Sequence, residues 1–121
     1  MAKADKFSPD LMRGSLDLMV LSVLFDGPQY GYSLQQRLRE ASGDMARLQA
    51  GTLYPLLHRL EADKLIRSRW ETGQGRPRKW YELTAAGRKR LEVQARQWQA
   101  YADCLRALLS PVLQGPGTEP A

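Results

Sequence analysis

The chain has 121 residues and a formal net charge of +5, from 18 lysines and arginines against 13 aspartates and glutamates. This length fits one domain with a modest core, and the positive charge suits an anionic partner without specifying which anion. One cysteine and one histidine exclude an intramolecular disulfide framework and metal sites that need several such ligands.

The N-terminal part predicts a short arm followed by a helix. Residues 1–7 are polar and have no periodic pattern, so we expect an arm that is flexible unless a partner orders it. Ser8 and Pro9 suit the N-cap and first position of a helix that runs to about Phe25. Apolar residues nearly encircle this helix, more than one small domain can cover, so we expect a second subunit to cover it.

A second helix is predicted from Gly31 to Ala41, after an Asp-Gly-Pro break at residues 26–28. Tyr32 stands close to its start and can donate a hydrogen bond from its hydroxyl to a phosphate. The free N–H groups of a helix N-terminus favour an anion at the same place. The alternative is that the tyrosine ring fills the seam between two helices.

The segment from Gly51 to Ile66, GTLYPLLHRLEADKLI, predicts the helix around which the chain is organised. Thr52 is placed to cap it, and Pro55 falls in its first turn, where a missing N–H costs nothing. Leucines at i, i+3, i+4 and i+7 predict its buried side: Leu53, Leu56, Leu57 and Leu60. The opposite side carries groups able to meet phosphates and base edges: Thr52, Tyr54, His58 and Arg59, with Arg47 just upstream.

Two short strands joined by an arginine-rich loop are predicted next. Residues 66–71 and 79–83 alternate as strands do, and the GQGRPR between them cannot sustain a helix or a central strand. From Lys64 to Arg90 there are nine basic residues and two acidic ones, which concentrates positive charge here. A helix able to enter a groove, followed by such a hairpin, is the order of parts in a winged helix-turn-helix. We expect three wing residues to reach phosphates or the minor groove: Arg76, Arg78 and Lys79.

A long last helix is predicted over residues 84–113, capped at Thr84. Its apolar stripe alternates steps of four and three residues over three heptads, the spacing of a coiled coil. We expect the stripe to pair with the same helix of a second chain, and packing back onto its own domain is the alternative. The stripe consists of Leu91, Ala95, Trp98, Ala102, Leu105, Leu109 and Val112. Residues 114–121 are rich in proline and glycine, and we expect them to be disordered.

The strings GTLYPLLHRLE and GRPRKWYELTAAG, with YGYSLQQRL upstream, resemble the signatures of PadR-type transcriptional regulators. The resemblance covers residues 11–112. It implies a mainly α fold with a small β-hairpin wing, in which residues 8–83 form a winged helix-turn-helix and residues 84–113 form a dimerisation helix. It also implies a homodimer that represses nearby genes. Two recognition helices in a dimer reach half-sites about one helical turn, ~34 Å, apart, so we expect an inverted-repeat operator in double-stranded DNA.

The resemblance further implies a small-molecule effector. PadR-type multidrug sensors are similar in placing a tryptophan where Trp98 stands and in sandwiching planar drugs there. Ala95 and Ala102 beside it either leave space for a flat aromatic ligand or give two indoles room to pack as an ordinary core. In the first interpretation, a planar aromatic compound would release the DNA.

Two other functions stay open. One is a winged-helix module for protein contacts, and the other is a binder of RNA or single strands that uses Trp70, Trp80 and Tyr81 as stacking platforms. Strand alternation puts Trp80 and Tyr81 on opposite faces, which counts against one exposed aromatic row. We expect no enzyme activity, no metal and no cofactor. Without an apolar run of about 18 residues or a signal-like N-terminus, we expect a cytoplasmic protein with no membrane contact.

Overall fold

The computed structural model of the chain describes residues 7–73 and 75–115, except for the side chain of Asp10. Nearly all of the expected N-terminal arm and most of the expected C-terminal tail lie outside these residues. The chain divides into two units between Leu91 and Glu92, and each is described by itself.

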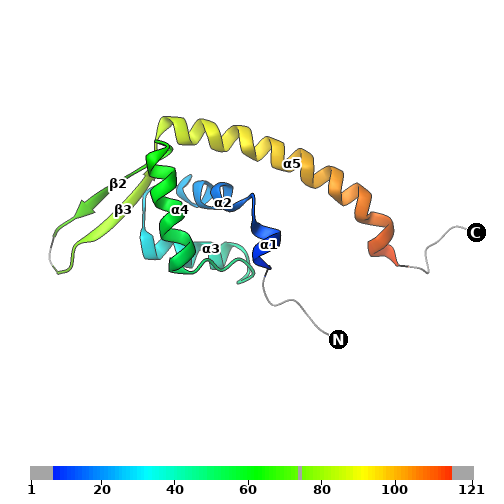
Figure 1. Ribbon diagram of the computed structural model, residues 1–121, viewed down its shortest axis with the longest axis horizontal. Helices are drawn as coiled ribbons and strands as arrows, with labels where there is room; N and C mark the ends of the chain where they lie inside the picture. Colours follow the sequence, from blue (N-terminus) through cyan, green and yellow to red (C-terminus); the bar gives the residue numbers. More distant parts are fainter. Residues whose placement is uncertain (1–6, 74, 116–121) are drawn as a thin grey trace, which may run out of the picture. The chain divides into compact units, whose positions relative to one another are not determined.

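Within the described residues, the first unit packs helices against a three-stranded antiparallel sheet of strand order β1-β3-β2 (Figure 1). The hairpin of β2 and β3 projects from the helices as a wing. The fold is therefore mainly α with a small β-hairpin, as the sequence predicts. Its elements are α1 (Pro9–Met12), α2 (Leu16–Leu24), β1 (Gln29–Tyr30), α3 (Gly31–Ala41), α4 (Ala50–Ala62), β2 (Ile66–Glu71) and β3 (Arg78–Leu83). A last helix, α5 (Ala85–Gln114), begins in the first unit and continues through the second.

The prediction of one continuous helix up to Phe25 is wrong. Ser8 does cap the start, since its hydroxyl accepts the Leu11 N–H at 3.2 Å, but α1 ends at Met12. Gly14 then adopts a φ of +93°, a left-handed conformation that glycine takes without a steric penalty, and the chain restarts as α2. This break lets Met12 and the inner side of α2 enter the same core. Most of the apolar surface is thus covered within the unit, and Leu11 stays 66% exposed.

The helix predicted over residues 31–41 is confirmed as α3, whereas β1 just before it was not predicted. β1 pairs with β3 at only two positions, Gln29 with Tyr81 and Tyr30 with Trp80. Two residues are too short a run to show an alternating pattern. The consequence is that the chain passes directly from the sheet into the N-terminus of α3.

The leucine side of α4 is buried as predicted, but the helix starts earlier than expected. Gln49 is its N-cap, with an extended backbone and no side-chain hydrogen bond, so the prediction that Thr52 caps the helix is wrong. Instead, the Thr52 N–H donates to the Gln49 carbonyl at 2.9 Å within the first turn. Pro55 therefore lies in the second turn, within the helix and not at its start. Leu53, Leu57 and Leu60 are fully buried and Leu56 nearly so.

The junction of α4, the wing and α5 is held by Thr84 and Gly87. The Thr84 hydroxyl accepts the Gly87 N–H at 3.0 Å, which confirms the predicted cap, and it donates to the Lys64 carbonyl at 2.7 Å. A Cβ on Gly87 would lie 1.9 Å from the Leu65 carbonyl oxygen, so only glycine allows this approach. One turn later, Leu91 is buried in the core of the first unit.

The apolar stripe of α5 therefore has two parts. Leu91, expected in a dimer seam, packs in its own domain. Among the described residues of the second unit, none joins the hydrophobic core. Trp98 is half-buried and meets the Tyr101 ring edge-on at 5.4 Å, and the remaining members of the stripe are exposed. These members are Ala95, Ala102, Leu105, Leu109 and Val112.

We predict that Gly87→Ala lowers the free energy of unfolding by about 1–3 kcal/mol, because the new methyl group forces α5 away from the Leu65 carbonyl. Urea unfolding followed by circular dichroism measures the change. Gly51→Ala is the matched control, because a Cβ there meets nothing within 4 Å, and it should raise stability by up to about 1 kcal/mol. Equal stability of Gly87→Ala and the parent chain would show that the junction is not close-packed.

Candidate nucleic-acid interface

The outward side of α4 is lined mainly by small residues. Because successive helical residues are about 100° apart, the side opposite the leucines is centred on Gly51, Pro55, His58 and Ala62. All of these residues are exposed, and only His58 carries a polar side chain. Such a strip lets the helix backbone approach a partner closely.

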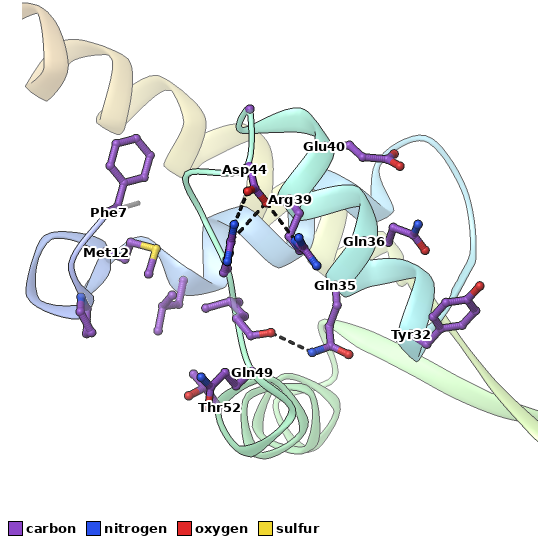
Figure 2. A pocket seen from close by; sticks show the side chains of 15 residues that line it. Phe7, Met12, Tyr32, Gln35, Gln36, Arg39, Glu40, Asp44, Gln49 and Thr52 are labelled. Carbon is purple, nitrogen blue, oxygen red and sulfur yellow. Dashed lines mark hydrogen bonds and ion pairs between the residues drawn. The ribbon is translucent and has the colours of Figure 1, made fainter. Parts of the chain in front are cut away.

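Thr52, on one edge of this strip, lines a groove of about 1190 Å³ between the N-terminal segment, α3 and the start of α4. Figure 2 shows Tyr32, Gln35 and Gln36 on the α3 side of this groove, with Gln49 beside Thr52 at the start of α4. The Gln35 amide donates to the Leu48 carbonyl at 2.8 Å, which fixes the turn between the two helices. Tyr32 is 67% exposed, so its ring does not fill a seam between helices.

Two arginines at this groove share one carboxylate. Asp44, in a left-handed conformation with φ +70°, accepts hydrogen bonds from Arg39 at 3.0 Å and from Arg47. The bonds from Arg47 and then Arg39 lower the pKa of Asp44 below its ordinary value. The cluster is therefore less positive than its two arginines suggest.

Arg59 on α4 forms an ion pair with Asp17 on α2. Its guanidinium donates to both carboxylate oxygens of Asp17, at 2.7 and 3.2 Å. The sequence suggested this arginine as a DNA contact, and in this structure it ties two helices together.

The outer face of the wing carries a compact charged and aromatic cluster. The Tyr30 hydroxyl donates to Glu71 at 2.6 Å, and the Tyr30 ring lies 4.5 Å from that of Trp80. Arg78 sits 4.4 Å above the Tyr30 ring and 3.6 Å from the Glu71 carboxylate. The bond from Tyr30 lowers the pKa of Glu71 and raises the pKa of the Tyr30 hydroxyl. Glu71 therefore stays ionised and forms an exposed ion pair with Arg78.

A second hollow, which we call the wing-root cavity, lies where α3, α4 and the wing meet. It has a volume of about 600 Å³. Its lining residues are Tyr30, Gly31, Tyr32, Tyr54, Arg76, Pro77, Arg78, Lys79 and Tyr81. The Tyr54 side chain packs against Gly31. A Cβ added at Gly31 would lie 2.8 Å from the Tyr54 hydroxyl oxygen.

The structure thus brings together five of the residues expected to contact DNA and separates three. Tyr32, Tyr54, Arg76, Arg78 and Lys79 line the wing-root cavity. Thr52, His58 and Arg59 lie elsewhere on α4.

Sequence reasoning missed Gln36 and Gln49 in the groove and Tyr81 in the cavity. The helical period could have found Gln36, because it lies one turn after Tyr32 on the same side of α3. Tyr81 gave no such signal, since strand alternation cannot tell which face is covered.

The wing aromatics do not form one exposed row. Tyr81 is 1% exposed, Trp80 is half-buried against Tyr30, and only Trp70 is open to solvent. In the described part of the chain, no group of three or more histidine, cysteine, aspartate or glutamate side chains could hold a metal ion. No helix within these residues is long and apolar enough to cross a membrane.

Helices α3 and α4 with the β2–β3 hairpin define a winged helix-turn-helix protein. Residues 20–93 match the model of the PadR-like family of transcriptional regulators. A Mycobacterium tuberculosis protein described as transcriptional regulator Rv3488 is 38% identical over 93 residues, which are 77% of this chain and 84% of that protein. The chain belongs to the PadR-like family.

Solved structures agree with this assignment. A PadR family transcriptional regulator from Eggerthella lenta is 39% identical, with a TM-score of 0.73 and coverage of 83% of this chain and 86% of that one. A transcriptional regulator from Clostridium thermocellum is 26% identical, with a TM-score of 0.75 and coverage of 81% and 96%.

Proposed function

We propose that this regulator is a homodimer that binds an inverted-repeat operator in double-stranded DNA and represses nearby genes. The observation that carries the proposal is the position of the wing cations Arg76, Arg78 and Lys79 around one cavity at the N-terminus of α3. Helix N-termini and cations both favour phosphates. The exposed strip of α4, with Thr52 and His58 at its edge and centre, supplies the element for the major groove.

The arrangement of the aromatics favours duplex DNA over single strands. A stacking platform needs successive exposed rings, and the burial of Tyr81 and half-burial of Trp80 leave Trp70 as the one exposed ring on the described part of β2 and β3. A cytoplasmic location, expected for a transcriptional regulator, stays a prediction.

Arg76→Ala tests the wing contribution most directly, because Arg76 is exposed at the loop and, unlike Arg67 and Arg78, forms no ion pair with a carboxylate of the described residues. We expect weaker binding to all duplexes and a salt dependence flatter by about one unit, measured by fluorescence anisotropy across salt concentrations. Arg96→Ala in α5 removes an equal charge and should leave the slope unchanged. Single-stranded DNA and RNA should compete poorly, and better competition by either would favour that other function.

Exposed apolar residues of α5 in the second unit support the proposed dimer. Leu105, Leu109 and Val112 expose apolar side chains in one stripe, and Leu108 beside them is 68% exposed. A contiguous apolar stripe at heptad spacing is stabilised by burial against a second copy. The expected dimer seam therefore runs from Ala95 to Val112, without Leu91.

Leu105→Asp should give monomers, because an unpaired carboxylate would lie in the proposed seam. Analytical ultracentrifugation measures the mass, and operator binding should be lost together with the dimer. Arg106→Asp, at the neighbouring position, places the same charge off the stripe and should still dimerise. A dimeric Leu105→Asp would locate the seam elsewhere.

We also propose that a planar aromatic compound binds at Trp98, with Ala95 and Ala102 giving it space, and releases the DNA. The half-burial of the indole and its edge-on contact with Tyr101 support an aromatic surface here. Release follows only if the ligand binds the DNA-free state more tightly than the DNA-bound state.

Trp98→Ala should keep DNA binding and lose the response to planar aromatic compounds. In the parent chain such compounds should quench tryptophan fluorescence at micromolar concentration and raise the operator Kd. The matched control is Trp70→Phe, which keeps Trp98 and should still respond. Quenching that persists unchanged in Trp98→Ala would place the ligand away from the seam.

A further inference from the structure

The wing-root cavity exists because β1 is short. β3 is paired with β2 along its length but with β1 only at Trp80 and Tyr81. After Tyr30 the chain turns into α3, so the edge of β3 at Arg78 and Lys79 borders the cavity and not a strand.

Tyr81 brings an unpaired hydroxyl to this cavity. Its side chain is 1% exposed, and in residues 7–73 and 75–115 no group forms a hydrogen bond with its hydroxyl. The hydroxyl oxygen is not among the fully buried unpaired polar atoms of the described residues, so it reaches the cavity surface and can donate to a group that enters there. Burial raises the pKa of Tyr81, with smaller contributions from Tyr54 and Glu61, so the hydroxyl stays protonated and available as a donor.

Tyr54 adds a second hydroxyl to the same cavity, beside the start of α3. Its position depends on Gly31, the first residue of α3, because any Cβ there would push the hydroxyl away. The N-cap residue Tyr30 gives no side-chain hydrogen bond to the first N–H groups of α3. Hydroxyl and backbone donors therefore meet at one place.

No carboxylate lines the cavity in the described part of the chain. Two acids lie close by and each accepts one hydroxyl: Glu61 accepts that of Ser68 at 2.6 Å, and Glu71 accepts that of the lining residue Tyr30. The Lys79 ammonium group lies 5.7 Å from the centre of the Tyr81 ring and 5.6 Å from the centre of the Trp70 ring. The lining offers donors and positive charge, and such a lining suits an anion that only accepts hydrogen bonds.

We propose that the wing-root cavity binds one phosphodiester of the DNA backbone, with Tyr54 and Tyr81 as hydrogen-bond donors and Lys79 and Arg78 as the charges. This rests on the proposed DNA binding and gives Tyr54 the role of a phosphate ligand, where the sequence suggested a base contact. Each half-site then has one phosphate that the protein holds between the wing and α3.

The test uses the full-length protein and a duplex selected by it from a random pool, remade with one phosphate at a time replaced by an uncharged methylphosphonate. Tyr54→Phe should bind the unmodified duplex about tenfold more weakly, since a hydrogen bond to a charged group is lost. On the duplex neutralised at one position per half-site, the loss should fall below about twofold, as a double-mutant cycle requires for a direct contact. Lys79→Ala should also weaken binding to the unmodified duplex, and its loss should shrink on the duplex neutralised at the same position. Tyr101→Phe and Lys89→Ala are matched controls outside the cavity and should show no such position.

A loss that is equal on every neutralised duplex overturns the phosphate site and leaves duplex binding intact. If the parent chain selects no duplex at all, the proposed function itself fails.

Two further variants separate binding from folding. Tyr81→Phe removes a hydroxyl that forms no hydrogen bond within the described residues, so its thermal midpoint should stay close to that of the parent chain. Its duplex affinity should fall, and the loss should disappear on the duplex neutralised at the same position as for Tyr54→Phe. Gly31→Ala should displace the Tyr54 hydroxyl and reproduce the Tyr54→Phe result. A lower midpoint of Tyr81→Phe with no position-specific change would show a structural role only, and would overturn the proposal for that residue.

Discussion

Burial of one side of α4 fixes the rotation of this helix, and the rest of the interface depends on that rotation. Rotating α4 by one residue would expose some of its leucines, at about 1.5–3 kcal/mol for each fully exposed side chain. With the leucines inward, the strip centred on Pro55 and His58 faces out. Thr52 and Tyr54 then point to opposite edges, one to the groove beside α1 and the other to the wing-root cavity. A single helix thereby serves two separate surfaces.

Local periodicity predicted most of the fold, because it reports which side of an element is buried. The bounds of α3, the buried leucines of α4 and the cap at Thr84 all follow from residues within a few positions of each other. Failures occurred where distant contacts decide. The break at Gly14 depends on how Met12 and α2 pack in the same core, which no local pattern reports. Leu91 is buried by residues distant in the sequence, and heptad spacing carries no information on them.

The candidate site was harder to predict, because charged residues were counted without their partners. Arg59 is held by Asp17, 42 positions earlier in the chain, and no sequence pattern links the two. The same applies to Tyr30 and Glu71, which are 41 positions apart. Alternation separated Trp80 from Tyr81, but only the packing of the sheet shows that Tyr81 is the buried one.

The ion pairs differ in how readily a phosphate can replace the carboxylate. Arg78 and Glu71 are both exposed and lie 3.6 Å apart, so their ion pair contributes little to stability. Arg78 can therefore leave Glu71 for a DNA phosphate at a small cost in free energy. Glu71 keeps its hydrogen bond from Tyr30 after the exchange. Removing Arg59 would instead break two hydrogen bonds and leave Asp17, which is 29% exposed, without its partner. Arg78 is therefore the more available cation, and Arg59 keeps α4 fixed on α2 while the wing exchanges its carboxylate for DNA.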